Sequence, residues 1–288
     1  TVVSVAMTAA ALFGFSSSHS FLQLCVWAVP YGLGAGSVDA GLNNFVALHY
    51  KSRHMSWLHC FWGIGATAGP YIMGLCLTRG FKWNSGYMVV GVIQIALVAC
   101  LVLSLPLWKV KKDGNSGQDT PHRQITLREG LRLPGAKAVL TAFFCYCALE
   151  ATAGLWASSY MVLHKGIAPQ TAAKWASFFY LGITLGRLAS GFVTDRLGDR
   201  NMVRCGQLLL LPAGDGAVLT GLIMVGLGCA PIYPSLLHET PDNFGVQYSQ
   251  SMMGMQMACA YVGSTFMPPL FGVAAERISV TLYPVCLV

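Results

Sequence analysis

Charged residues and paired cysteines are both scarce in this sequence. Asp, Glu, Lys and Arg together make up 10% of its 288 residues, whereas they make up about a quarter of an average soluble domain. The 10 cysteines lie scattered through apolar segments, and no Cys-x-x-Cys pair occurs among them. This pattern is not typical of disulfide-stapled or zinc-binding proteins. We therefore expect the cysteines to be small packing residues within apolar helices.

The sequence also lacks the motifs of the common enzyme classes. It contains no phosphate-binding loop, no nucleophile with a base at recognisable spacing, and no histidines at metal-ligand spacing. The glycine run at 32–36 lies inside an apolar segment rather than between a strand and a helix, so it is not a nucleotide-binding fingerprint. We predict a protein that is not an enzyme and that needs no metal or cofactor.

Long apolar runs dominate what is present. Hydrophobic residues make up 55% of the chain, and 32 glycines supply the small residues that let membrane helices pack closely. We predict ten apolar spans, at 1–15, 21–48, 56–78, 86–107, 138–162, 173–194, 202–213, 216–238, 249–273 and 279–288. A crossing needs about 20 residues, so the first and last spans are cut and the seventh is too short to cross unaided. The sequence predicts an all-α membrane protein.

The Lys and Arg residues are unequally divided between the loops on the two sides of the predicted membrane. If the spans alternate sides, 13 of the 18 Lys and Arg residues fall in one set of loops and 5 in the other. Cytoplasmic loops carry this excess, so we expect the richer set, including the polar linker 109–137, to lie in the cytoplasm. The formal net charge of +7 therefore indicates a multi-pass protein of the cell membrane with the lipid bilayer as its partner, and not a nucleic-acid-binding protein.

A charged decapeptide follows the sixth span. It reads Gly-Phe-Val-Thr-Asp-Arg-Leu-Gly-Asp-Arg, and its pattern is carried by Gly191, Asp195, Arg196, Gly198 and Arg200. It resembles the loop that joins paired helices in major facilitator superfamily transporters, where it acts in gating. A glycine permits close helix packing or a tight turn, and an acid beside an arginine can pair or cap helix ends. The alternative is an ordinary solvated turn between two helices.

An internal duplication supports this resemblance. The pattern Gly-x-Thr-x-x-Pro-x-x-x-Gly begins at Gly65 and again at Gly263, and Gly-Leu-Gly precedes each copy. Equivalent helices of two pseudo-symmetric six-helix halves should match in this way. We expect an incomplete N-terminal bundle at 1–108 (spans equivalent to 3–6), a linker at 109–137 and a C-terminal bundle at 138–288 (spans equivalent to 7–12). Because the chain opens inside an apolar run, we expect a fragment that lacks the first two helices.

Two carboxylates fall within predicted spans, Asp39 and Glu150. An ionisable group at bilayer depth is costly and usually has a function or a partner. Desolvation favours the neutral form of an acid, which suits a group that carries a proton. We interpret both as candidate proton-coupling residues. The alternatives are a structural hydrogen bond between helices for Asp39 and an ion pair near the membrane end for Glu150.

The third span carries His59 and Trp62 one helical turn apart, and Asn43 lies one turn after Asp39. A flat apolar ring beside hydrogen-bonding groups suits a sugar, whose C–H face stacks while its hydroxyls need donors and acceptors. We predict that these three residues contact the solute. The alternative is that Trp62 belongs to the aromatic belt at the membrane interface.

Further candidates lie in the second half. The segment Pro231-Ile-Tyr-Pro234 predicts a broken helix whose free backbone groups face a cavity, with Tyr233 directed toward the pathway. Gln256 and Trp156 are also candidate solute contacts, although Trp156 can equally pack the helix bundle. Arg187 lies near the end of its span, where the main expectation is that its side chain snorkels to the cytoplasmic surface.

A narrower resemblance rests on two runs, Gly32 to Val46 and Trp57 to Ala66. They are similar to the fourth and fifth helices of fucose-permease-like transporters, which are proton-coupled sugar symporters. This resemblance implies that Asp39, followed by Asn43, takes part in proton coupling. His59 stands where that family has a polar amide that contacts sugar, so the resemblance leaves the identity of the sugar open.

These observations favour a secondary active transporter that moves a small polar solute, a sugar first of all, by proton-coupled alternating access. An exporter of amphipathic compounds on the same fold is an alternative. A non-transporting sensor, a scaffold or an inactive truncated remnant is another, which the missing helices and the short seventh span favour.

Overall fold

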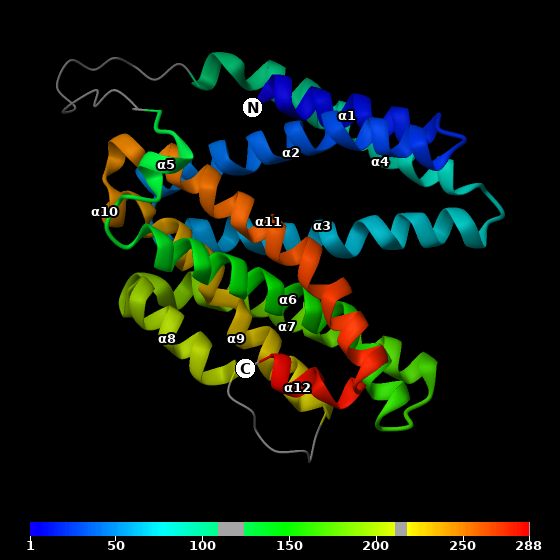
Figure 1. Ribbon diagram of the computed structural model, residues 1–288. Coiled ribbons are helices and arrows are strands. Elements are labelled where there is room, and N and C mark those ends of the chain that lie inside the picture. The colour runs from blue at the N-terminus through cyan, green and yellow to red at the C-terminus, as the bar shows by residue number, and fades with distance from the viewer. Residues whose placement is uncertain (109–123, 211–217, 288) are drawn as a thin grey trace, which may run out of the picture. The chain divides into compact units, whose positions relative to one another are not determined.

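The computed structural model describes residues 1–108, 124–210 and 218–287, and every regular element within these ranges is a helix (Figure 1). Seven helices in the described part are long and apolar enough to cross a membrane. They are α2 (Phe21–His49), α3 (Ser52–Thr78), α4 (Trp83–Ser104), α6 (Ala136–Leu163), α7 (Pro169–Leu197), α9 (Val218–His238) and α11 (Val246–Arg277). The apolar α1 (Val2–Ser16) is shorter.

The remaining elements are short. They are η1 (Leu105–Trp108), α5 (Leu127–Gly130), α8 (Asp199–Leu210), α10 (Thr240–Phe244), η2 (Val280–Leu282) and α12 (Tyr283–Cys286). The predicted seventh span corresponds to α8, which has 12 residues and begins with charged ones. The predicted tenth span holds η2 and α12 within its described part. The described part of neither segment is long enough to cross a bilayer.

The chain forms two compact units. The first contains 1–42 and 65–121, and the second contains 43–64 and 122–288, so α2 and α3 each contribute to both. The predicted division at 1–108 and 138–288 stays a prediction. Residues 109–123 of the predicted linker lie outside the described ranges.

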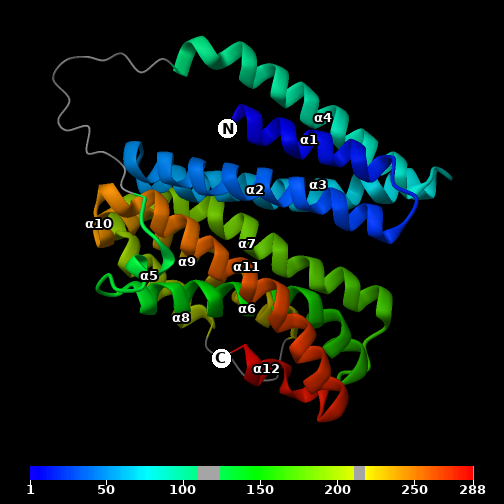
Figure 2. The same ribbon diagram turned by 45° about the horizontal axis from the view of Figure 1, so that its top comes forward.

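In the first unit, α1 packs along α4 (Figure 2). Gln94 on α4 donates a hydrogen bond to the Thr8 hydroxyl on α1 (2.8 Å). The Asn84 amide donates to the carbonyl oxygens of Ser16 and Ser18 at the end of α1. Polar side chains thus join two apolar helices whose own backbone groups are satisfied internally.

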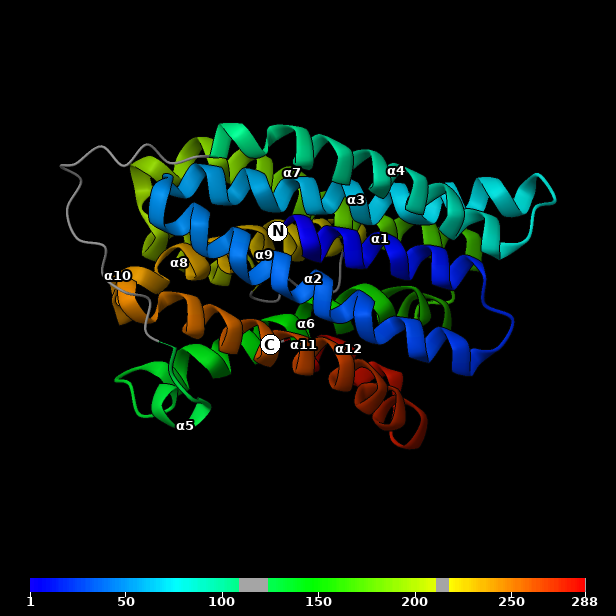
Figure 3. The same cartoon turned by 90° about the horizontal axis from the view of Figure 1, so that it is seen from above.

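In the second unit, α11 lies along α6, and α9 packs against both α7 and α8 (Figure 3). Glycines bring these backbones together. A Cβ at Gly226 on α9 would lie 2.3 Å from the Phe179 carbonyl oxygen on α7, and one at Gly263 on α11 would lie 2.4 Å from the Phe144 carbonyl oxygen on α6. Such close approach lets membrane helices gain van der Waals contact where the hydrophobic effect between them is weak.

The predicted break at Pro231 and Pro234 is wrong, because α9 continues through both prolines to His238. Membrane helices tolerate proline where packing against neighbouring helices offsets the lost backbone hydrogen bond, and α9 packs against both α7 and α8. The Tyr146 hydroxyl of α6 also donates to the Cys229 carbonyl oxygen of α9 (2.8 Å).

Candidate functional site

A buried histidine–asparagine pair joins α3 to α2. His59 Nε2 lies 3.0 Å from Asn43 Oδ1, and the two residues are 7% and 1% exposed. They face each other because only Tyr50 and Lys51 separate the end of α2 from the start of α3, so the two helices run antiparallel. The amide oxygen accepts, so Nε2 donates and Nδ1 is left as the acceptor nitrogen.

Arg187 on α7 lies beside this pair and is 3% exposed. One of its terminal nitrogens lies 3.4 Å from the His59 carbonyl oxygen, and the other lies 3.6 Å from Glu150 Oε2 on α6. Its guanidinium carbon lies 5.0 Å from the centre of the Trp62 ring, within the range of a cation–π interaction. The expected snorkelling of Arg187 to the surface is therefore wrong.

Local packing explains why Arg187 stays inside. Gly63 on α3 approaches α7 so closely that a Cβ there would lie 2.2 Å from Thr184 Oγ1. The Cys60 thiol also contacts the Thr184 carbonyl oxygen. This contact places the next turn of α7, which carries Arg187, against the His59 backbone, where an internal counter-ion is available from Glu150.

Tyr233 from α9 forms the aromatic wall of this group. Its ring centre lies 5.0 Å from that of His59 and 5.3 Å from that of Phe143 on α6. The His59 cluster, as we call it, contains six residues of the second unit: Asn43, His59, Trp62, Glu150, Arg187 and Tyr233. Five of these were predicted site residues. Arg187 was not, although a cation inside an apolar span could have been matched with Glu150.

The other candidate residues lie elsewhere. Asp39 is partly buried on α2, one helical turn before Asn43, and belongs to the first unit. Gln256 on α11 is fully buried and accepts a hydrogen bond from the Thr240 hydroxyl (3.0 Å). Its Nε2 has no hydrogen-bond partner in the described part of the chain. The structure does not bring Gln256 into the His59 cluster.

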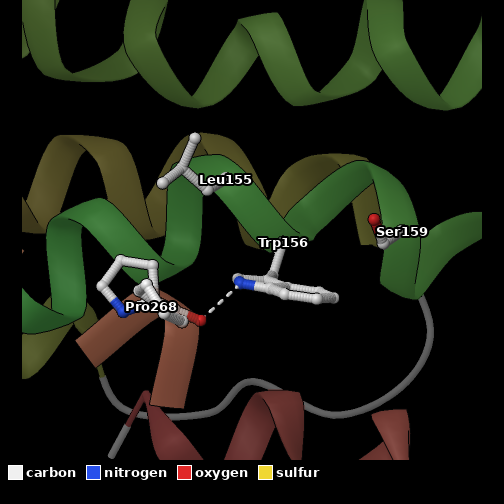
Figure 4. A pocket seen from close by; sticks show the side chains of 5 residues that line it. Leu155, Trp156, Ser159 and Pro268 are labelled. Carbon is white, nitrogen blue, oxygen red and sulfur yellow. Dashed lines mark hydrogen bonds between the residues drawn. The ribbon is translucent and has the colours of Figure 1, made fainter. Parts of the chain in front are cut away.

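Trp156 joins α6 to α11. Its indole nitrogen donates to the Pro268 carbonyl oxygen at 2.9 Å (Figure 4), and its ring packs edge-on against Phe271. A cavity of about 330 Å³ lies beside it, lined by Leu155, Trp156, Ser159, Pro268 and Pro269. These contacts fit the packing alternative for Trp156 and place it away from the His59 cluster residues.

The charged decapeptide lies at the end of α7 and the start of α8, against the turn between α2 and α3. Gly191 contacts Trp57 so closely that a Cβ would lie 2.2 Å from the indole nitrogen. Asp195 accepts a hydrogen bond from the Arg53 backbone N–H (3.3 Å) and lies 3.5 Å from Arg53 Nε.

The second half of the decapeptide forms the turn into α8, where Gly198 has a φ of 76°. Arg196 is exposed.

A second set of contacts ties the start of α8 to the end of α9. Asp199 accepts hydrogen bonds from the Ser52 hydroxyl and from His238 Nδ1, the latter at 2.8 Å. His238 Nε2 lies 3.1 Å from the Tyr50 carbonyl oxygen. We call Tyr50, Ser52, Asp199 and His238 the His238 latch. None of the four was a predicted site residue, since these contacts join segments far apart in sequence.

An outer ion pair accompanies the latch. Arg200 Nε lies 3.6 Å from Glu239 Oε1, and the Arg200 side chain is largely exposed, so this pair contributes little to stability. Partial burial, together with the negative charge of Asp199, raises the pKa of Glu239. The pair therefore weakens on acidification, as Glu239 loses its charge at a higher pH than an ordinary glutamate.

Comparison with known proteins identifies the family. The model of the Major Facilitator Superfamily matches residues 1–213 and 138–285, and the chain belongs to this superfamily. With its apolar helices, it is a multi-pass integral membrane protein of a transporter fold.

Two curated relatives cover most of the chain. One is Bypass of stop codon protein 6 of Saccharomyces cerevisiae (strain ATCC 204508 / S288c), 22% identical over 93% of this chain. The other is the glucose/mannose transporter GlcP of Bacillus subtilis (strain 168), 23% identical over 94% of this chain. The chain spans 62% of the length of the yeast relative and 70% of that of GlcP.

Solved structures share the fold. The chain is similar to the transporter FucP in the outward conformation, with a TM-score of 0.75 and 16% identity over 99% of this chain and 79% of FucP. It is also similar to the human organic anion transporter MFSD10, with a TM-score of 0.72 and 16% identity over 99% of this chain and 74% of that one. These similarities confirm the predicted fold and the resemblance to fucose permeases.

Proposed function

We propose that the protein is a secondary active transporter of a small polar solute, a sugar first of all, driven by a proton gradient through alternating access. The observation that carries this proposal is the His59 cluster. Charged and polar side chains at bilayer depth are costly and mark solute or ion pathways. Here an ion pair, a histidine–asparagine pair and two aromatic rings gather among apolar helices.

The residues divide into roles. Asn43 and His59 offer an amide and an imidazole to solute hydroxyls, and the half-exposed Trp62 offers an indole ring for stacking. Tyr233 packs against His59 and keeps it in place. Asp39 and Glu150 are the proposed proton carriers. Trp156 and Gln256 are supporting candidates, since their described partners are backbone and side-chain groups of neighbouring helices.

The gating role falls to the charged decapeptide. Its contacts with the turn between α2 and α3, together with the His238 latch, fix one state of the transporter when formed and release it when broken. Alternating access requires such a two-state element, whose contacts exist on one side only at a time. We place this latch and the linker 109–137 on the cytoplasmic side of the cell membrane, in agreement with the positive charge of their loops.

The names of the relatives support a sugar and a proton. GlcP is described as a glucose/mannose transporter, and FucP as a fucose:proton symporter. MFSD10, described as an organic anion transporter, shares the same fold, so the fold alone does not select the solute.

The test is uptake of radiolabelled hexoses, deoxyhexoses and hexuronic acids by the full-length protein in proteoliposomes, with and without an imposed inward proton gradient. We expect gradient-driven uptake that Asp39→Asn abolishes, while this variant still exchanges internal for external solute. Glu276→Gln, at an exposed position near the end of α11, is the control and should behave as the wild type. If no sugar moves with or without the gradient, the sugar assignment fails, and an exporter of amphipathic compounds or a non-transporting role becomes the better account.

A further inference from the structure

The guanidinium of Arg187 has hydrogen-bonding capacity that its surroundings leave unused. Its Nε is fully buried and has no hydrogen-bond partner in the part of the chain that the structure describes. Its nearest approach to Glu150 is 3.6 Å, which is longer than the roughly 2.7–2.9 Å of a charge-assisted hydrogen bond. The ion pair therefore neutralises the charge without saturating the five N–H donors of the side chain.

Protonation of Glu150 would change the charge of this ion pair. Glu150 and Arg187 together carry no net charge, and Arg187 is 3% exposed. If Glu150 accepts a proton from the aqueous phase, its carboxylate becomes a neutral carboxylic acid, and Arg187 is left as a buried cation without a counter-ion. Such an uncompensated charge is strongly unfavourable in the interior. A second anion that reaches Arg187 would remove this penalty.

The other groups that face Glu150 do not supply that anion. Glu150 interacts electrostatically with Tyr146 on its own helix, with Tyr180 on α7 and with Cys229 on α9. Arg187 completes this set from α7, and His59 approaches Arg187 from α3. All of these except Arg187 are neutral in their ordinary states near neutral pH. Within the part of the chain that the structure describes, none of these groups supplies a second negative charge for Arg187.

We propose that the solute carries a carboxylate, as a sugar acid of monosaccharide size does, and that this carboxylate replaces Glu150 as the partner of Arg187 when Glu150 is protonated. The proposal rests on the proposed transport function and deepens it by naming the class of solute. A carboxylate matches the planar donor fork of a guanidinium. The sugar hydroxyls then meet Asn43 and His59, and Trp62 holds the guanidinium in place from its ring face.

This exchange couples the proton to the solute. Binding of the proton strengthens binding of the solute, and binding of the solute strengthens binding of the proton by the same factor, because a coupling free energy between two sites is reciprocal. Because one proton is taken up with each anion, binding of the anion should strengthen by up to about tenfold for each unit of pH decrease. A neutral sugar of the same size gains no such dependence through this pair.

The experiment measures binding of galactose and galacturonate, which differ only in a hydroxymethyl group and a carboxylate, to the full-length protein at acidic and neutral pH. We expect the wild type to prefer galacturonate, and more so at acidic pH. Glu150→Gln mimics the protonated acid and should bind galacturonate tightly at both pH values. Glu276→Gln, which changes an exposed glutamate, should retain the wild-type pattern.

A double variant that removes both charges serves as a control for misfolding. Glu150→Gln/Arg187→Gln leaves no uncompensated charge, so it should fold even if Arg187→Gln alone does not, and it should lose the preference for galacturonate by at least about tenfold. If galactose binds as well as galacturonate, and the double variant does not change their ratio, the anionic solute is excluded while sugar transport stands. If neither sugar binds to the wild type, both the proposed sugar transport and this inference fail.

Discussion

His238 and Asp199 are joined by a 2.8 Å hydrogen bond from His238 Nδ1 to Asp199 Oδ2. The other ring nitrogen lies 3.1 Å from the Tyr50 carbonyl oxygen. A carboxylate and a carbonyl can only accept, so the ring donates from both nitrogens, which requires its doubly protonated form. One charged side chain on α9 thereby binds both the start of α8 and the turn that follows α2.

This geometry predicts that His238→Gln loosens the latch. An amide offers donors from one end only, so one of the two hydrogen bonds is lost. We expect a loss of about 1.5–3 kcal/mol of local stability, the usual range for hydrogen bonds to charged groups. Hydrogen exchange measures this directly, and the segment at 50–56 should exchange faster in the variant.

The latch prediction has its own control. His19, exposed before α2 and in the first unit, is not part of the latch, so His19→Gln should leave exchange at 50–56 unchanged. Equal protection of this segment in His238→Gln and the wild type would show that the latch does not restrain the turn.

The buried pair predicts a double-mutant cycle. Arg187→Gln leaves Glu150 without its counter-ion and should lower the free energy of unfolding by about 3–5 kcal/mol, whereas Glu150→Gln/Arg187→Gln should cost much less, since replacing both charges together is often close to neutral. Denaturation of the purified protein in detergent compares these two variants with Glu150→Gln and the wild type. Additive losses in the single and double variants would contradict a direct interaction between the side chains.

Close helix contact at Gly226 gives a prediction for packing. A methyl group there would press on the Phe179 carbonyl oxygen, and a backbone atom has little freedom to move away. We expect Gly226→Ala to lower the free energy of unfolding by about 1–3 kcal/mol. Gly221→Ala is the matched change on the same helix, where a Cβ meets nothing within 4 Å. It should be neutral or stabilising by up to about 1 kcal/mol, and similar losses at the two positions would argue against close packing as the cause.

Much of the fold follows from sequence, because a run of apolar residues of crossing length leaves the helix as the main solution in a bilayer. The positions of α2, α3, α4 and α6 were predicted to within a few residues. The prolines of α9 misled the prediction, because whether a helix continues through a proline depends on its packing against neighbouring helices, which sequence does not place.

The site was predictable in part. Five members of the His59 cluster were identified because a polar or aromatic residue inside an apolar span is conspicuous. Arg187 was misjudged, since depth along a helix does not reveal which neighbour it faces. The latch could not be predicted, because Ser52, Asp199 and His238 meet only through tertiary packing.

The central claim is coupling of solute to proton, and the most direct measurement is proton movement caused by the solute alone. The full-length protein is reconstituted with a pH-sensitive dye inside the vesicles, and the transported solute is added outside without any imposed gradient. We predict acidification of the interior that follows solute entry, and none with Asp39→Asn, although this variant still exchanges labelled solute. Solute entry into wild-type vesicles without acidification would contradict the account.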